Sequence, residues 1–143
     1  MTMLWLNLAA TLYLTGLIWT IQLVHYPLMD WVAPELFVEF HHQHGARISI
    51  VVIVPMVIEL ATAALLAVRP PPGVLPAVPL AGLALVAVIW TSTFAIQVPC
   101  HQRLSRGFDA AVHRRLVRSN WLRTVAWTLR AVVMIAAAIQ ANS

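Results

Sequence analysis

Residues 75–98 read LPAVPLAGLALVAVIWTSTFAIQV, an apolar stretch without a single charged side chain. A helix that crosses a bilayer needs about 20 mostly apolar residues, because each residue advances about 1.5 Å through roughly 30 Å of hydrocarbon. Three other stretches meet this length, and they run from Leu4 to Val24, from Ala46 to Val68 and from Trp121 to Gln140. The sequence therefore predicts an all-α fold, an integral membrane four-helix bundle in a single domain of residues 1–143.

The composition excludes an ordinary soluble domain, since 61% of the residues are hydrophobic and only 10% are charged. The net charge of +4 would suit a nucleic-acid binder, but the arginines are unevenly distributed. Those near the connections after the first and third spans are Arg47, Arg103, Arg106, Arg114, Arg115, Arg118 and Arg123. Basic connections face the cytoplasm and attract anionic headgroups. We therefore expect a lipid bilayer and no nucleic acid as partner, the bacterial inner (plasma) membrane as location, and both termini outside.

The two basic connections are each about 20 residues long by this division of the chain. Each could lie on the membrane surface or extend the following span into the cytoplasm. Pro34 suits the first position of a helix, Gly45 could interrupt one, and Asp109 favours a helix start.

The two halves of the chain share a spacing of polar residues. His25, His44 and Arg47 are separated by 19 and 3 residues, and the same intervals separate His101, Asn120 and Arg123. Each half would be a helix, a cytoplasmic segment and a helix. This order suggests a parallel repeat about an axis normal to the membrane.

All six histidines fall in the two cytoplasmic connections, and they are His25, His41, His42, His44, His101 and His113. Neutral imidazole is a common metal ligand and a proton carrier near neutral pH. His41 and His44 would share one face of a helix, and His25 and His101 leave their spans at equivalent levels. We therefore predict a metal site made by His25, His41, His44 and His101, with copper, iron, zinc or haem as the bound group.

A simpler interpretation is that the histidines only hydrogen-bond headgroups or backbone carbonyls, because no strong zinc pattern such as HExxH is present. His42 and His113 are the most expendable members. His42 faces away from the shared helical face, and His113 lies among solvated arginines. Cys100, the single cysteine, is either a small interfacial residue or a reactive thiol that could bind a metal.

Two ionisable residues fall inside the predicted spans, Glu59 in the second and Arg130 in the fourth. A charge near the bilayer centre costs at least about 2.5–3.5 kcal/mol, so each needs a partner. We expect a structural Glu59–Arg130 pair near the middle of the membrane. The alternative is a polar cavity beside Pro55, which Gln22 and Gln97 would extend towards the histidines.

The segments Val98-Pro-Cys-His-Gln-Arg-Leu104 and Asn120-Trp-Leu-Arg-Thr124 resemble those of the anthrone oxygenase-like family of small four-helix membrane proteins. The resemblance covers the four-helix layout and is most specific from Trp90 to Trp127. It implies the oxidation of a flat lipophilic phenol by molecular oxygen, with catalytic positions at His101, Asn120 and Arg123. The family commonly has asparagine where this chain has His101, whereas Asn120 and Arg123 match it.

Two functions are compatible with these residues. The first is a membrane-embedded oxidoreductase or oxygenase that acts on a lipophilic small molecule beside the histidines. The second is a non-catalytic assembly factor or small transporter, stabilised by the Glu59–Arg130 pair. Four short helices offer little area for a transport path, so we expect a transporter to form a homo-oligomer.

Overall fold

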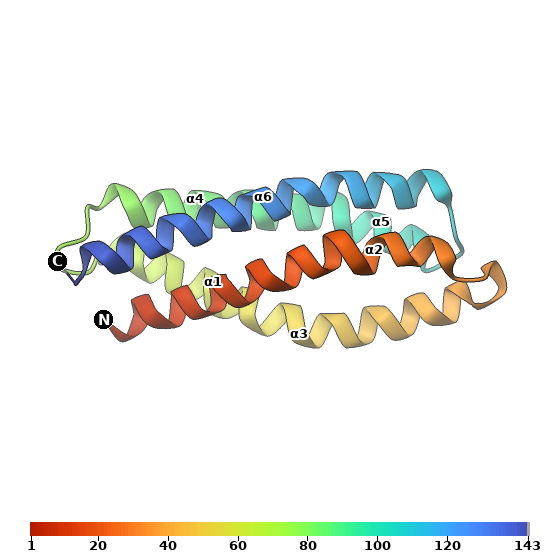
Figure 1. The fold of residues 1–143 in the computed structure, drawn as a ribbon, viewed down its shortest axis with the longest axis horizontal. Helices are drawn as coiled ribbons and strands as arrows, with labels where there is room; N and C mark the ends of the chain where they lie inside the picture. Colours follow the sequence, from red (N-terminus) through yellow and green to blue (C-terminus); the bar gives the residue numbers. More distant parts are fainter. Residues whose placement is uncertain (143) are drawn as a thin grey trace.

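The computed structural model describes residues 1–142, and within them four long helical segments run side by side (Figure 1). These segments are Thr2–Trp31, Pro34–Val68, Ala77–Leu104 and Ala110–Gln140. Each is long and apolar enough to span a bilayer, with mean hydropathies of 1.5, 2.5, 1.9 and 1.6 in chain order. The prediction of an all-α integral membrane four-helix bundle is confirmed.

The first and third segments are each interrupted by a short π-helical turn. The first consists of α1 (Thr2–Thr20), η1 (Ile21–His25), α2 (Tyr26–Leu28) and the 3-10 turn η2 (Met29–Trp31). The third consists of α4 (Ala77–Ser92), η3 (Thr93–Gln97) and α5 (Val98–Leu104). The second segment is the continuous helix α3 (Pro34–Val68), and the fourth is α6 (Ala110–Gln140).

A proline two residues after each π turn explains where the turn forms. Pro27 and Pro99 have no N–H group, and their rings clash with the carbonyls four residues earlier. A widened turn absorbs this clash while the helix continues. Both halves of the chain therefore share the order of π turn, proline and long helix. Aligned on these turns, His25 corresponds to Gln97, whereas the starts of α3 and α6 have the offset that separates His25 from His101, so the predicted repeat stays a prediction.

The connections at the histidine end are far shorter than the sequence predicts. Only residues 32–33 separate the first two segments, and residues 105–109 separate the last two. Of the two alternatives for these basic stretches, extension of the following span is the one that the structure shows, because α3 and α6 run through them. α3 has Pro34 at its start, and the Asp109 carboxylate caps α6 by accepting the N–H groups of Ala111 and Val112 at 2.8 and 3.0 Å. Gly45 does not interrupt α3.

The two termini lie at one end of the bundle, and the connections at residues 32–33 and 105–109 lie at the other (Figure 1). The rings of Phe37 and Phe108 meet there, with their centroids 4.9 Å apart. The expectation that both histidine-bearing parts of the chain gather at one end is therefore confirmed.

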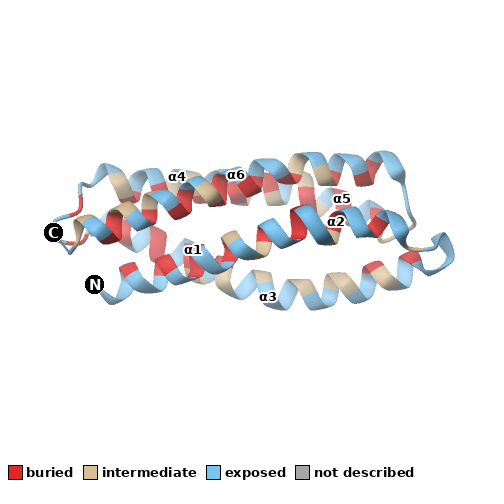
Figure 2. Cartoon of the chain, in the orientation of Figure 1, coloured by how far each residue is buried: buried red, intermediate tan, exposed pale blue. Residues whose placement is uncertain are grey.

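The four segments do not pack equally tightly. Buried residues recur along α1, α4 and α6, whereas the half of α3 near Pro34 is mostly exposed or half-buried (Figure 2). Between Pro34 and Pro55, α3 buries only Phe37 and His41. The exposed valines and isoleucines of this half are the side chains expected to face lipid. The loose contact leaves space between α3 and its neighbours at the histidine end.

Candidate functional site

Glu59 and Arg130 form the predicted ion pair inside the bundle. Arg130 Nε lies 2.9 Å from Glu59 Oε1, and both side chains are completely buried. Trp127 Nε1 donates to the other carboxylate oxygen at 3.1 Å, and Thr11 Oγ1 donates to Oε1 at 2.9 Å. Both oxygens of Glu59 are therefore occupied by donors from α1 and α6. The structural interpretation of this pair is confirmed.

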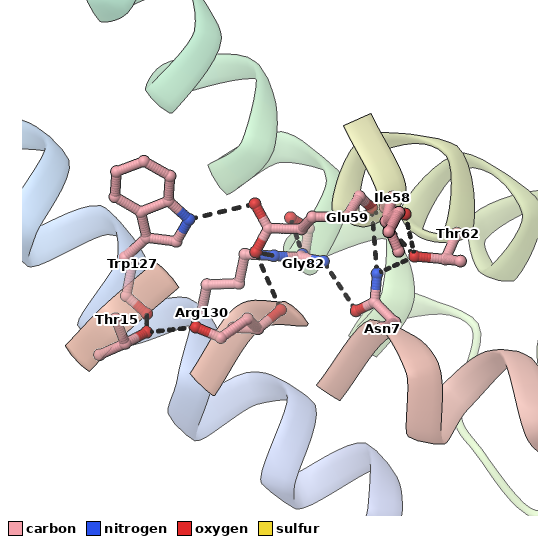
Figure 3. Close-up of polar contacts among 9 residues, drawn as sticks. Asn7, Thr15, Ile58, Glu59, Thr62, Gly82, Trp127 and Arg130 are labelled. Carbon is pink, nitrogen blue, oxygen red and sulfur yellow. Dashed lines mark hydrogen bonds and ion pairs between the residues drawn. The ribbon is translucent and has the colours of Figure 1, made fainter. Parts of the chain in front are cut away.

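This network joins all four membrane-length segments (Figure 3). Arg130 Nη2 donates to Asn7 Oδ1 of α1 at 2.8 Å, and Arg130 Nη1 donates to the backbone carbonyl of Gly82 in α4. Asn7 Nδ2 in turn donates to Thr62 Oγ1 of α3 at 2.7 Å. In hydrocarbon, where water cannot supply the missing bonds, such a saturated network is worth more than its parts. It fixes the register of the helices relative to one another.

Gly82 leaves the space that Arg130 fills. A Cβ atom at position 82 would lie 2.8 Å from Arg130 Nη1 and 3.2 Å from Met134 Sδ. The Arg130 side chain is held by hydrogen bonds on three nitrogens, so it cannot move aside cheaply.

We therefore expect Gly82→Ala to lower the free energy of unfolding by about 1–3 kcal/mol through overpacking. Gly16→Ala in α1 is the matched control, because a Cβ there meets nothing within 4 Å and alanine favours helix by up to about 1 kcal/mol. Thermal unfolding of both variants in the same detergent measures the difference. Equal melting temperatures for the two would contradict the close approach at Gly82.

A second polar layer lies between this network and the histidine end. Asn120 Nδ2 donates to Gln22 Oε1 at 2.8 Å, and Arg123 Nη1 donates to Asn120 Oδ1 at 3.3 Å. Gln97 lies nearby, where its Oε1 accepts a hydrogen bond from Ser119 at 3.2 Å. The π turns contribute both glutamines, Gln22 from η1 and Gln97 from η3. The predicted residues Gln22, Asn120 and Arg123 are therefore brought into one chain of hydrogen bonds.

The four histidines of the predicted metal site converge at the end of the bundle opposite the termini. His41 Nε2 lies 3.1 Å from His101 Nδ1, and His101 Nε2 lies 3.0 Å from the Tyr26 hydroxyl. The ring centroids of His25 and His44 are 4.2 Å apart, and those of His44 and His101 are 6.2 Å apart. α3 supplies two of these rings, while the first and third segments supply one each. Tyr26 joins the cluster although no sequence pattern singled it out.

The histidine rings contact one another mainly through their faces and through a nitrogen–nitrogen hydrogen bond. Within residues 1–142, no three histidine, cysteine, aspartate or glutamate side chains are arranged so that they could hold a metal ion. The Nε2 atom of His25 is buried without a hydrogen-bond partner. A metal site at His25, His41, His44 and His101 therefore stays a prediction. Cys100, for which the sequence left open a small interfacial residue or a reactive thiol, is a buried member of the apolar core.

His113 has a different role from the one that the sequence suggests. It is buried, its Nε2 lies 2.9 Å from the Tyr26 carbonyl oxygen, and its Nδ1 lies 2.9 Å from Asp30 Oδ1. The expectation that His113 is expendable among solvated arginines is wrong, because α6 turns this side chain towards the first segment, while Arg114, Arg115 and Arg118 are exposed. His42 is exposed, as predicted.

An apolar pocket of about 320 Å³ opens beside this cluster, between α3 and the third segment. Its apolar wall includes Val52, Met56 and Phe94, and its polar wall includes Tyr26, His44, Gln97, His101 and Arg123. Glu59 is not part of the wall, so the intramembrane ion pair and this pocket are separate features. A groove of about 500 Å³ lies on the other side of His101, where His41, His42 and Gln102 contribute to its lining. His101 therefore stands between the pocket and the groove.

No protein-family model, curated protein or solved structure matches this chain. The resemblance to the anthrone oxygenase-like family stays a prediction.

Proposed function

We propose that this protein is a membrane-embedded oxidoreductase that acts on a lipophilic small molecule in the pocket beside the histidines. The observation that carries this proposal is the hydrogen-bonded chain from the Tyr26 hydroxyl through His101 to His41, which begins at the wall of an apolar pocket. Few structural roles need three titratable side chains linked in series beside a pocket. Proton transfer to or from a bound molecule needs such a series.

The pocket is suited to an apolar substrate that arrives from the lipid. Its volume of about 320 Å³ is at the lower end of the range for small-molecule sites, roughly 300–1,000 Å³. It is lined mainly by apolar side chains, with a few convergent polar groups, which is the usual division in such sites. One wall is the loosely packed half of α3, whose outer residues face the bilayer.

The proton path leads from this pocket to the groove on the other side of His101. A neutral imidazole accepts a proton at one nitrogen and donates from the other, so His101 can pass a proton from Tyr26 or the substrate to His41. His41 lines the groove together with the exposed His42. The substrate and the proton would therefore leave the site in different directions.

The family resemblance adds molecular oxygen as the oxidant. Oxidation of a ring CH₂ group to a carbonyl by O₂ places one oxygen atom on the substrate and releases the other as water with the two hydrogens. The residues of this chain would bind the ring and remove the first proton. If a transition metal or haem takes part, His25, His41, His44 and His101 are the side chains that would bind it.

Oxygen uptake tests the proposal directly. Purified protein in phosphatidylcholine nanodiscs, supplied with anthrone as a flat lipophilic probe, is expected to consume oxygen above the rate of empty nanodiscs and to convert the ring CH₂ group of anthrone into a second carbonyl, which gives anthraquinone. A folded protein that binds anthrone without oxygen uptake would contradict oxidation of this substrate class by oxygen.

Elemental analysis of the same sample tests the metal-assisted version. Near-stoichiometric copper, iron, zinc or haem iron that is lost in His44→Ala would support this version, in which the rings would have to rearrange, because no three of the described side chains are placed to hold a metal ion together. Oxygen consumption by a metal-free, fully folded sample would contradict a role for a metal, while leaving the oxidoreductase in place.

The Glu59–Arg130 network favours a second candidate, a non-catalytic assembly factor or small transporter. Both intramembrane charges are used to join the helices, as a structural component requires. Specific binding of a lipophilic molecule without any turnover would support this candidate over the first.

We also propose that the histidine end faces the cytoplasm of a bacterium and that both termini lie outside, because the arginines concentrate at the histidine end. Single cysteines in a Cys100→Ala background provide the test. A cysteine at Gly107 should resist a membrane-impermeant maleimide in intact cells, and one at Thr2 should react. The reverse pattern would contradict this orientation.

A further inference from the structure

Arg123 is a buried cation without a counter-charge in the described part of the chain. Arg123 is only 6% exposed. The ion pairs within residues 1–142 join Arg130 to Glu59 and His113 to Asp30, so no described carboxylate lies within ion-pair distance of Arg123. A guanidinium group stays protonated in proteins. The positive charge is therefore held inside the bundle by weaker contacts.

These contacts leave part of the guanidinium unused. Nη1 donates to Asn120 Oδ1 at 3.3 Å, the group lies 5.1 Å from the centre of the Trp127 ring, and the Tyr26 side chain is a further polar neighbour. Arg123 Nε is buried without any hydrogen-bond partner. Arg130 lies about two turns further along α6. In contrast to Arg123, it donates hydrogen bonds from three of its nitrogens, and a carboxylate faces it.

Arg123, whose Nε is the unpaired donor, lines the pocket, and a second residue with an unpaired donor lines it as well. Trp90 also lines the pocket, and its Nε1 is likewise buried without a hydrogen-bond partner. Buried donors are almost always satisfied in native proteins, so two unsatisfied ones at a single pocket call for a ligand that accepts. One of the two carries a full positive charge.

We propose that the pocket binds an amphiphilic anion, a molecule with an apolar body and one oxyanion group, as in an aryl carboxylate or a phenolate. The oxyanion binds to Arg123 and Trp90, and the apolar body lies along Val52, Met56 and Phe94. This inference rests on the proposed function for the position of the substrate, but binding itself needs no oxidation. It adds the chemical class of the substrate and gives Arg123, a neighbour of Tyr26, the role of recognising it beside the Tyr26–His101–His41 chain that moves protons.

The pocket should prefer an anion because, when it is empty, the positive charge of Arg123 is buried without a partner. A buried charge that loses its partner destabilises a protein strongly, and an oxyanion would supply both the missing charge and the missing acceptor. Hydrogen bonds to charged groups contribute about 1.5–3 kcal/mol, which corresponds to roughly 10- to 100-fold in affinity. A neutral molecule of the same shape would fill the apolar wall without this gain.

Equilibrium dialysis with 2-naphthoate and its neutral methyl ester tests the inference. The protein is held in phosphatidylcholine nanodiscs, and empty nanodiscs correct for partition of each probe into lipid. We expect the protein to bind 2-naphthoate at least about tenfold more tightly than the ester. Equal affinities for the two probes, or binding of neither by folded protein, would overturn the proposal.

Three variants test which residues cause the preference for 2-naphthoate over its ester. Arg123→Gln should weaken 2-naphthoate binding roughly 10- to 100-fold and leave the ester unchanged, whereas Arg123→Lys should keep a preference for the acid. Trp90→Phe should cost only a few-fold, since it removes one neutral donor. Retention of the acid preference in Arg123→Gln would overturn the role of Arg123. If Arg123→Gln does not fold, the wild-type comparison and Arg123→Lys still decide the matter.

Failure of this inference and failure of the proposed function give different results. Preference for 2-naphthoate without oxygen uptake on any flat ring probe would contradict the oxidoreductase and leave the anion site. Oxygen uptake on anthrone by a protein that binds acid and ester equally would contradict the anion site alone.

Discussion

Replacing Glu59 with glutamine is expected to lower the free energy of unfolding by about 3–5 kcal/mol, and Arg130→Gln by a similar amount. Each change leaves the other charge buried without its counter-charge, at a place where neither water nor lipid can compensate. The double variant Glu59→Gln/Arg130→Gln should be less destabilised than either single variant, because no unpaired charge remains. Thermal or denaturant unfolding of the four proteins in one detergent measures the cycle.

Two exposed residues on the same helices provide the controls for this cycle. Glu39→Gln on α3 changes a carboxylate that contacts only the exposed Gln43, and Arg118→Gln on α6 changes an exposed arginine. Both should stay within about 0.5 kcal/mol of wild type. If the effects of the two buried substitutions are strictly additive, Glu59 and Arg130 do not act as a pair.

Replacing His101 with alanine is expected to reduce oxygen uptake roughly 10²- to 10⁴-fold, the usual contribution of a proton-transfer residue. The change removes the link between the Tyr26 hydroxyl and His41, so a proton from the pocket no longer reaches the groove. Tyr26→Phe removes only the hydroxyl and should show a smaller loss in the same assay. Binding of anthrone should be little affected in the Tyr26 variant, which would separate chemistry from binding.

His42→Ala is the matched control for His101→Ala. His42 is exposed on α3, next to His41 in sequence, and it lines the groove without being a link of the Tyr26–His101–His41 chain. We expect its oxygen uptake to stay within about twofold of wild type. A comparable loss in His42→Ala, or full activity in His101→Ala, would show that the proton path does not run through His101.

The intramembrane pair was predictable because the bilayer imposes a simple rule. An acid and a base within apolar spans have few ways to avoid the cost of burial, and pairing is the most direct. The depth of Glu59 and Arg130 follows from the rise of each helix. The remaining members of the network could not be inferred in this way, because Asn7 and Trp127 are ordinary residues of membrane helices until their neighbours are known. Gly82 contributes its backbone carbonyl, and because it has no side chain it leaves room for Arg130.

The histidine cluster, too, could be predicted from the sequence only in part. Six histidines near one membrane boundary suggested convergence, and four of them do meet. The detailed pairing depends on the π turns, which rotate Tyr26 and His101 relative to an uninterrupted helix. Only Pro27 and Pro99 signal these turns in the sequence, and a proline alone does not show whether a helix kinks, ends or widens. The role of His113 did not follow from the sequence, because Arg114 and Arg115 beside it are exposed while its own side chain is buried.

The sequence by itself determined the four spans, the end at which the histidines and arginines gather, and the need for a Glu59–Arg130 pair. These features follow from hydrophobicity, helix length and the cost of a buried charge, which act along each helix separately. The packing of the helices was needed to show that Arg123 has no counter-charge within residues 1–142, that the Tyr26–His101–His41 chain ends at an apolar pocket, and that Arg123 and Trp90 share the wall of this pocket. The physical reason is that partnership and empty space depend on the rotation and packing of neighbouring helices, which no single span encodes.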